Sequence, residues 1–299
     1  MTVITEKNII EYVKDANKDE KLIARVFAPK DNISSVVVIA SAMGASQSTY
    51  KALAQWLCES LNCAVVTFDY RGMYKSSAGS LKHNKLNITD WATKDCQAVI
   101  DFCVQVFGEK DMTWIGHSLG GQVFGLIPNN HHVKKLITIA AGTGYWRHQA
   151  LKVRPKMLWF WFAIQPMFTL FAGYFPGKRF NIVGDLPRNV IWQWRRWCMR
   201  ADYLLDGNDE TTSLYQKLSH PIDVLYFSDD ELISEKNVKQ LHQFYQGASK
   251  TFHLIEPSKH QLNKIGHFGY FKAANSQTLW QQTLADLFSQ DTKRRAQHG

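Results

Sequence analysis

The chain contains 299 residues, of which 45% are hydrophobic and 20% are charged, and it carries a formal net charge of +9 at neutral pH. This length and composition allow one sizeable buried core and are ordinary for a soluble globular protein. Five cysteines without C-x-x-C spacing argue against a disulfide scaffold and against a zinc site. Lys and Arg residues are spread along the chain without a recognisable nucleic-acid module, so we predict no nucleic-acid partner.

The amino-terminal residues indicate where the protein works. Residues 1–15 include Glu6, Lys7 and Glu11 and lack a long apolar run, which is not the pattern of a secretory signal. Together with thiols that fit a reducing compartment, this predicts a cytoplasmic location.

Short apolar runs alternate with helix-like segments along most of the chain. The run Val36–Ala40 is apolar throughout, as is typical of a strand buried on both faces. Strands that alternate with helices predict an α/β fold, with a mostly parallel central sheet and helices on both faces. In chain order, we predict strands at 9–13, 22–27, 36–40, 64–68, 112–115, 135–140, 222–227 and 251–255, and helices at 50–61, at 90–107, from 121 and near the end.

The alternation stops between Gly142 and His220. Roughly 80 residues lie there, which is more than a single crossover helix needs, so the stretch must build an additional unit. Six of the ten tryptophans of the chain lie in this stretch: Trp146, Trp159, Trp161, Trp192, Trp194 and Trp197.

Residues 116–120, Gly-His-Ser-Leu-Gly, fit the pattern G-x-S-x-G. They follow a predicted strand and precede a predicted helix, which is the context of a nucleophile elbow. Ser118 is therefore the candidate nucleophile. A serine hydroxyl is a weak nucleophile, so this interpretation also requires a histidine and a carboxylate.

Both partners follow in the chain. The predicted strand 222–227 leads into Asp229 and Asp230, and His267 precedes the final helix. The order Ser, Asp, His is that of α/β-hydrolases. We expect Ser118 to attack a carbonyl, His267 to move the proton and the aspartate to orient the imidazole.

Alternatives exist for two of these three residues. Asp229 competes with Asp230, which we prefer, and His253 and His260 compete with His267. A histidine within a strand is more often structural, and His260 lies in a polar stretch.

The loop after strand 36–40 is the expected source of one oxyanion donor, and the residue after the nucleophile is the source of the other. The backbone N–H groups of Leu119 and of Met43 are the candidates, with Gly44 as the alternative to Met43. The Met43 side chain is then free to line an acyl pocket.

The chain resembles the α/β-hydrolase superfamily, on its serine aminopeptidase/esterase–lipase branch, and a group of bacterial predicted α/β hydrolases. The matching segments are 42–44, 68–72, 116–121, 144–146, 173–176, 194–198 and 266–268. Departures are Tyr74, where many relatives have a second glycine, and Ser41-Ala42, where many have His-Gly. The resemblance implies a hydrolase core at 1–143 and 218–299 and a helical cap at 144–217. It also favours Asp230, because relatives often have a proline at the place of Ser234.

A charge-free run of 19 residues, Met157–Phe175, approaches the length of a transmembrane helix. Gln165, Pro166 and Thr169 interrupt it, and one span would separate Ser118 from His267. We therefore reject a span. Either the cap only lines a pocket, which we favour, or it also contacts lipid weakly through its aromatic and basic rim.

These observations predict a serine hydrolase that acts on a carboxylic ester or thioester with an apolar acyl group, a small-molecule substrate. The alternatives are an acyltransferase with the same triad and a non-catalytic lipid-binding protein. A peptidase is a weaker alternative, because the cap offers no obvious acidic subsite for an amino terminus. No metal or organic cofactor is needed, and the sequence does not predict an oligomeric state. The candidate pocket residues are Met43, Trp146, Trp159, Phe160 and Trp194.

Overall fold

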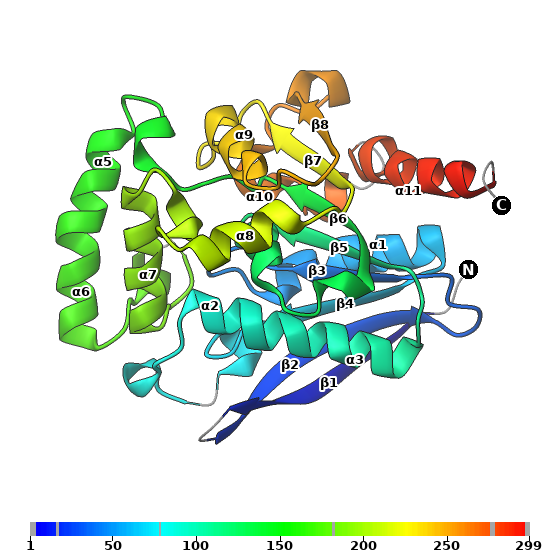
Figure 1. The fold of residues 1–299 in the computed structure, drawn as a ribbon, viewed down its shortest axis with the longest axis horizontal. Coiled ribbons are helices and arrows are strands. Elements are labelled where there is room, and N and C mark those ends of the chain that lie inside the picture. The colour runs from blue at the N-terminus through cyan, green and yellow to red at the C-terminus, as the bar shows by residue number, and fades with distance from the viewer. Residues whose placement is uncertain (1–3, 16–17, 78, 181–182, 276–278, 297–299) are drawn as a thin grey trace.

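The computed structural model describes residues 4–15, 18–77, 79–180, 183–275 and 279–296. Its strands form one eight-stranded sheet in the order β1-β2-β4-β3-β5-β6-β7-β8 (Figure 1). The strands from β4 across to β8 pair in parallel, whereas β2 pairs antiparallel with β1 and with β4. This confirms the predicted α/β-hydrolase fold. The strands are β1 (Ile4–Asp15), β2 (Lys18–Pro29), β3 (Val36–Ala40), β4 (Ala64–Asp69), β5 (Met112–His117), β6 (Val133–Ile139), β7 (Ile222–Phe227) and β8 (Lys250–Ile255).

Helices cover both faces of the sheet because successive strand residues point to opposite sides. In β3, Val36 and Val38 belong to one buried cluster and Val37 and Ile39 to the other. Helices α3, α8 and α9 contribute to the first cluster, and α1 and α11 to the second. The helices of the core are α1 (Lys51–Leu61), α2 (Ile88–Asp90), α3 (Gln97–Phe107), α4 (Leu119–Gln122), α8 (Asp209–Lys217), α9 (Glu235–Gln243), α10 (Gly266–Gly269) and α11 (Gln281–Ala296).

Two predicted helices differ in detail from the structure. The helix predicted at 90–107 contains a π-helical segment, Trp91–Cys96, between α2 and α3. The helix after Ser118 is short, since α4 passes into a 3₁₀ turn at Val123–Leu126.

The inserted stretch lies at the opposite end of the molecule from α11, at the left in Figure 1. Helices α5 (Arg154–Trp159) and α6 (Gln165–Ala172) are joined by a π-helical segment, Phe160–Ile164, and form the outer edge. Helix α7 (Arg188–Met199) runs beside them on the side of the sheet (Figure 1). No helix in the described residues is both long and apolar enough to cross a bilayer.

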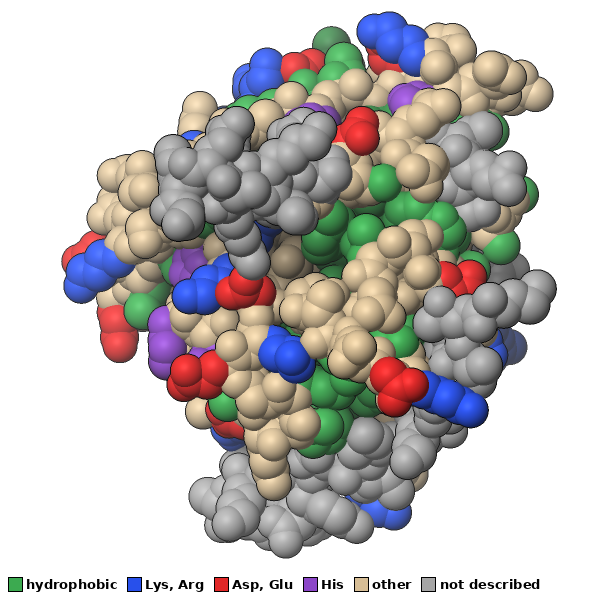
Figure 2. Space-filling view, turned by 90° about the vertical axis from the view of Figure 1, so that its right-hand side faces the viewer, with side chains coloured by type: hydrophobic (Ala, Val, Ile, Leu, Met, Phe, Trp, Pro, Cys, Tyr) green, Lys and Arg blue, Asp and Glu red, His purple; other side chains and the backbone are tan. Residues whose placement is uncertain are grey.

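The opposite end of the molecule has a mixed surface. On the face beside α11, acidic and basic side chains are scattered among polar and apolar ones (Figure 2). That end therefore shows no large area of a single charge sign among its described side chains.

Candidate active site

Ser118 lies in the sharp turn between β5 and α4. Its φ of 49° and ψ of −111° are unusual for a residue with a side chain, and such strain is found where function requires it. The Ser118 N–H donates to the Ile139 carbonyl at 3.0 Å, and the Ser118 carbonyl accepts from Gly121 and Gln122. The surrounding backbone thus holds the strained turn in place.

The flanking glycines allow the turn to pack closely. A Cβ at Gly116 would lie 2.4 Å from the Gly121 Cα, and a Cβ at Gly120 would lie 2.3 Å from the Ala40 carbonyl oxygen. Real Cβ atoms do not approach backbone so closely. The G-x-S-x-G spacing is therefore required by contacts within the turn and with β3.

His267 and Asp230 form a hydrogen-bonded pair. The distance from His267 Nδ1 to Asp230 Oδ2 is 2.8 Å, and their side chains are 3% and 2% exposed. The other carboxylate oxygen, Oδ1, accepts from the backbone N–H groups of Leu232 and Ile233. Because the Asp230 carboxylate can only accept, the imidazole proton stays on Nδ1 and donates to it, and Nε2 of a neutral His267 keeps a lone pair for proton transfer.

The neighbouring aspartate has a different role. The Asp229 carboxylate accepts from the backbone N–H groups of Ile265, at 2.9 Å, and Gly266, at 3.1 Å. Asp229 therefore holds the loop before His267, while Asp230 contacts the imidazole itself.

The alternative histidines have other partners. His253 Nε2 lies 2.8 Å from Asp223 Oδ1, and His260 Nδ1 lies 2.8 Å from Gln282 Oε1. Neither is among the described residues that line the cavity beside Ser118.

A cavity of about 300 Å³ lies between the core and the inserted stretch. Ser118 and His267 both line it, and most of its wall is apolar. Three of the five predicted pocket residues, Met43, Phe160 and Trp194, are in the wall. The apolar lining also includes Ala42, Leu119, Val153, Met157, Trp161, Val183, Leu232, Ile233 and Phe268.

The other two predicted pocket residues lie outside the lining of this cavity. Trp146 and Trp159 are not among the described residues that line the cavity. Trp159 is 64% exposed because it points away from the core, and Trp146 stacks beneath the Arg147 guanidinium. Trp161 lines the cavity instead, and it lies about 200° around the helix from Trp159.

The loop after β3 faces the same cavity. The Ala45 N–H donates to the Ala42 carbonyl, which closes a turn around Met43 and Gly44. Among the described residues, neither the Met43 nor the Leu119 backbone N–H has a hydrogen-bond acceptor. Both groups are thus available to an oxyanion.

Tyr74 explains one departure from the family pattern. Its hydroxyl donates to the Gly44 carbonyl at 2.5 Å, and the Gly184 N–H donates to the same carbonyl at 3.1 Å. Gly44 has a φ of +70°, and a Cβ there would lie 2.6 Å from Gly184 N. The tyrosine therefore fixes the loop that contains Met43.

His117 joins the elbow to the other parts of the site. Its Nε2 lies 3.1 Å from the His267 carbonyl, and its Nδ1 lies 2.8 Å from the Tyr50 hydroxyl, which also accepts from the Ala42 N–H. Burial holds the pKa of His117 well below its usual range, so the ring is neutral. Because a carbonyl only accepts, the proton is on Nε2, and Nδ1 accepts from Tyr50.

Few charged groups reach the cavity. Lys156 and Glu231 are the Lys, Arg, Asp or Glu side chains among its described lining residues, and the Glu231 carboxylate lies 3.7 Å from Lys264 Nζ. Gln122, Gln149 and Tyr203 add polar groups.

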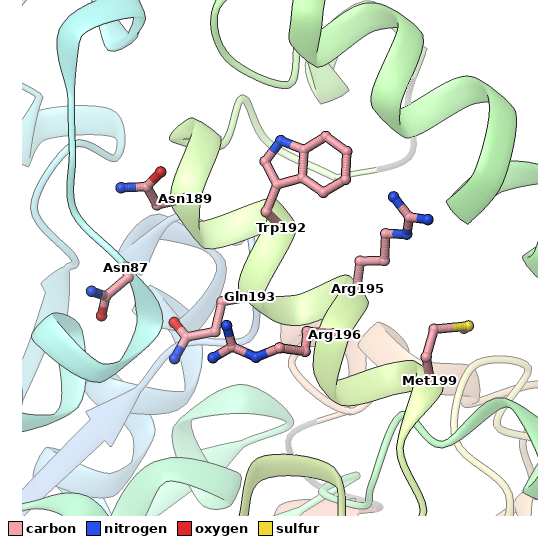
Figure 3. Close-up of a pocket in the computed structure, with 7 residues that line it drawn as sticks. All are labelled: Asn87, Asn189, Trp192, Gln193, Arg195, Arg196 and Met199. Atoms are coloured by element: carbon pink, nitrogen blue, oxygen red, sulfur yellow. The ribbon is translucent and has the colours of Figure 1, made fainter. Parts of the chain in front are cut away.

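A second hollow, of about 520 Å³, lies along α7. Figure 3 shows its lining residues, which include Trp192, Arg195 and Arg196 and come mainly from that helix. Neither Ser118 nor His267 lines it, so its larger volume does not make it the candidate active site.

Solved structures with the same fold cover nearly the whole chain. The esterase Pf2001 of Pyrococcus furiosus has a TM-score of 0.63 at 12% identity, over 96% of this chain and 91% of that chain. The mouse α/β hydrolase domain-containing protein 10 has a TM-score of 0.58 at 14% identity, over 94% and 99%. Est816, described as an N-acyl homoserine lactone degrading enzyme, has a TM-score of 0.58 at 14% identity, over 91% and 100%. At these identities the likeness shows the fold.

The sequence itself identifies the family. No curated protein sequence matches the chain. Residues 31–190 match the family model of serine aminopeptidases, S33, and this segment is more than half of the chain and includes Ser118. The chain therefore belongs to the serine aminopeptidase S33 family and is an α/β hydrolase.

Proposed function

We propose that this hydrolase cleaves a carboxylic ester or thioester with an apolar acyl group, through an acyl-enzyme on Ser118. The observation that carries the proposal is the 2.8 Å contact between His267 Nδ1 and Asp230 Oδ2, with Ser118 and His267 in the wall of one apolar cavity. A strained serine, an oriented histidine and a buried carboxylate are the groups that acyl transfer needs.

In the first half of the reaction, Ser118 Oγ attacks the acyl carbon and its proton moves to His267 Nε2. The Leu119 and Met43 N–H groups stabilise the developing oxyanion, each by a few kcal/mol. The bond to the leaving group then breaks, and His267 returns the proton to the leaving oxygen or sulfur.

In the second half, a water molecule attacks the acyl-enzyme. His267 takes the proton of that water, the bond to Ser118 Oγ breaks, and the proton returns to Ser118. The products are a free acid and the restored enzyme.

The cavity wall supports an apolar acyl group. Carbon and thioether surface comes from Met43, Met157, Phe160 and Trp161. Among the described lining residues, Lys156 and Glu231 are the only Lys, Arg, Asp or Glu side chains. Apolar pockets with a few polar groups bind acyl chains. The description of Pf2001 as an esterase and of Est816 as degrading an N-acyl lactone agrees with acyl chemistry.

A series of p-nitrophenyl esters of increasing acyl length tests the proposal. Each buried methylene stabilises the transition state by about 0.8 kcal/mol, so kcat/KM should rise about fourfold per methylene until the cavity is full. Ser118→Ala should abolish turnover, and Asp230→Asn should lower kcat about 10⁴-fold because the imidazole loses its orientation.

Asp229→Asn is the matched control. It changes the adjacent carboxylate, which binds loop N–H groups, so kcat should fall far less than in Asp230→Asn. Equal losses in the two variants, or unchanged turnover in Ser118→Ala, would contradict the proposed roles.

A peptidase is the second candidate, because the family model is that of aminopeptidases and the cavity includes Glu231. A carboxylate is the group that would bind a substrate amino terminus. Glu231 is half-exposed, and its carboxylate lies beside Lys264, which would compete with a substrate amino group. This favours ester hydrolysis over peptide hydrolysis. Aminoacyl p-nitroanilides separate the two: turnover of these anilides above that of the esters, lost in Glu231→Gln, would favour the peptidase.

A further inference from the structure

The outer helix of the inserted stretch has an unusual distribution of side chains. Helices α5 and α6 with their π-helical joint form one continuous helical segment at the left edge of Figure 1. Large apolar side chains point to solvent along this segment, in contrast to an ordinary surface helix. They are Trp159 (64% exposed), Phe162 (58%), Met167 (43%), Leu170 (60%) and Phe171 (88%), which we call the apolar ridge.

The buried side of the same segment is partly polar. Gln165 and Thr169 are fully buried, and the Gln165 side-chain amide donates to the Thr169 hydroxyl at 3.3 Å. The segment thus buries polar groups and exposes aromatic ones. A row of exposed large apolar side chains of this kind marks a surface that meets a partner.

Positive charge surrounds the apolar ridge. Exposed Lys152 and Lys156 lie at one end, and exposed Lys178 and Arg179 follow the other end. The Arg195 guanidinium lies 4.6 Å from the centre of the Phe162 ring, within the ridge itself. The sequence contains no Asp or Glu between Asp111 and Asp185. Asp185 itself lies beside Lys178, whose backbone N–H donates to its carboxylate at 3.1 Å, so the cations around the ridge outnumber the carboxylate found there.

We propose that the apolar ridge docks on the surface of an anionic lipid bilayer. Trp and Phe side chains enter the boundary between headgroups and acyl chains, and flanking Lys and Arg side chains bind lipid phosphates. A second copy of this chain fits less well, because a symmetric pair would bring the like-charged ends together. Among its described side chains, the opposite end of the molecule shows acidic and basic groups intermixed (Figure 2).

Docking by this face would bring the catalytic cavity close to lipid. Met157 and Phe160 lie in the same helical segment as the ridge, and they line the cavity that Ser118 shares. Membrane contact and ester cleavage remain separate functions, since the described cavity lining includes none of the ridge residues.

Co-sedimentation with lipid vesicles tests the proposal. The full chain should bind vesicles of phosphatidylcholine and phosphatidylglycerol in about a 7:3 ratio far better than pure phosphatidylcholine, and added salt should weaken the binding. The double variant Leu170→Ser/Phe171→Ser should bind about tenfold or more weakly, and so should Lys178→Glu/Arg179→Glu.

Val106→Ser/Leu214→Ser is the matched control. These residues are 52% and 45% exposed but lie on α3 and α8, so vesicle binding should not change. Hydrolysis of p-nitrophenyl acetate in solution should be the same in Leu170→Ser/Phe171→Ser as in the wild type. This readout separates a failure of docking from a failure of the proposed chemistry.

Three results would overturn the proposal. The first is that the wild-type chain does not bind anionic vesicles, and the second is that Leu170→Ser/Phe171→Ser binds them as well as the wild type does. The third is a wild-type dimer that becomes a monomer in Leu170→Ser/Phe171→Ser, because a second copy would then cover the ridge.

Discussion

At the scale of single residues, His117 links three separate parts of the candidate site. It is the last residue of β5, directly before Ser118. Its Nε2–H donates to the backbone carbonyl of His267, and through Tyr50 it reaches the loop that contains Met43. The candidate nucleophile, the candidate base and a candidate oxyanion donor are thereby held by one buried neutral ring. We therefore interpret His117 and Tyr50 as positioning residues.

Tyr50→Phe tests this interpretation. The variant leaves the Ala42 N–H and His117 Nδ1 without their shared partner, which costs about 1–3 kcal/mol for a buried group. We expect kcat for the preferred p-nitrophenyl ester to fall about tenfold or more with KM nearly unchanged, because the acyl pocket is intact.

Tyr270→Phe is the control for this variant. Tyr270 is also fully buried, but its hydroxyl bonds to Thr283 and not to the three parts of the site. Its loss should lower the melting temperature without lowering kcat. Equal effects on kcat in the two variants would mean that the Tyr50 contacts only stabilise the fold.

The sequence offers two adjacent aspartates, Asp229 and Asp230, as the carboxylate that orients His267. Residue types alone do not distinguish between them. The choice depends on which carboxylate meets the backbone N–H groups of Ile265 and Gly266 and which meets the imidazole. These contacts join segments more than thirty residues apart. Local patterns carry no information about them.

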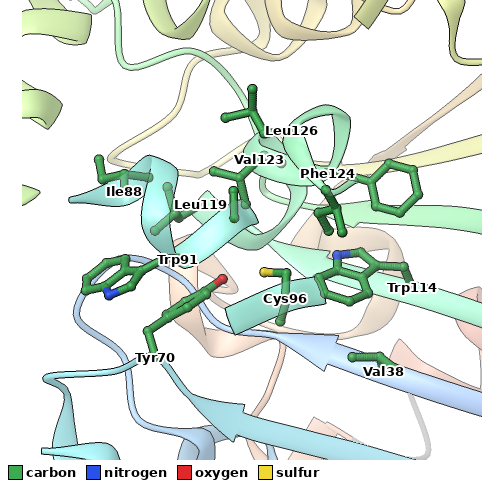
Figure 4. Close-up of a cluster of buried hydrophobic side chains, with 14 of the residues drawn as sticks. Val38, Tyr70, Ile88, Trp91, Cys96, Trp114, Leu119, Val123, Phe124 and Leu126 are labelled. Carbon is green, nitrogen blue, oxygen red and sulfur yellow. The ribbon is translucent and has the colours of Figure 1, made fainter. Parts of the chain in front are cut away.

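At the scale of elements, the elbow could be predicted because its causes are local. A strand, a tight turn and a helix lie within the eleven residues 112–122 and leave a clear pattern, and the glycines follow from contacts within the turn and with β3. Below the elbow, Leu119 and Val123 pack in a cluster with Trp91 and Trp114 (Figure 4). The core thus supports the turn that the sequence predicts.

The orientation of the outer helix could not be predicted in the same way. Residues 157–171 are apolar apart from Gln165 and Thr169, and these two polar residues lie on the buried side. The period of 3.6 residues therefore does not indicate which side faces the cavity. The sequence therefore predicts Trp159 as a pocket residue, whereas the structure has Trp161 in the cavity wall. Only the packing of the segment against α7 and the core decides between the two.

At the scale of the whole molecule, several buried histidines make stability depend on pH. His242 is fully buried between Thr138 and the Val238 carbonyl, and burial lowers its pKa to about 4. Burial also lowers the pKa values of His117, His148 and His220. Burial acts in the opposite sense on Asp95, whose pKa is raised to about 6 despite its contact with Arg71.

The sign of the histidine effect follows from proton binding. A histidine with a lowered folded pKa binds fewer protons in the folded state, so its contribution is complete above about pH 6.5 and is lost as pH falls towards 4. Asp95, with a raised pKa, stabilises the fold at low pH and loses that contribution as pH rises from about 3.8 to 6. The two effects oppose each other in the same range.

A comparison of variants isolates the histidine effect. When the pH is lowered from 6.5 to 4, the free energy of unfolding should fall by about 3 kcal/mol less in His242→Gln than in the wild type. Urea unfolding at several pH values measures this difference. A pH dependence in His242→Gln identical to that of the wild type would refute the assignment.

The central claim is that Ser118 is an activated nucleophile, and labelling with a small alkyl fluorophosphonate tests it most directly. Peptide mass spectrometry of the labelled chain should place the phosphonate on Ser118, and Ser118→Ala should remain unlabelled while folding normally. A folded wild-type chain that stays unlabelled, or that is labelled at another serine, would contradict the claim.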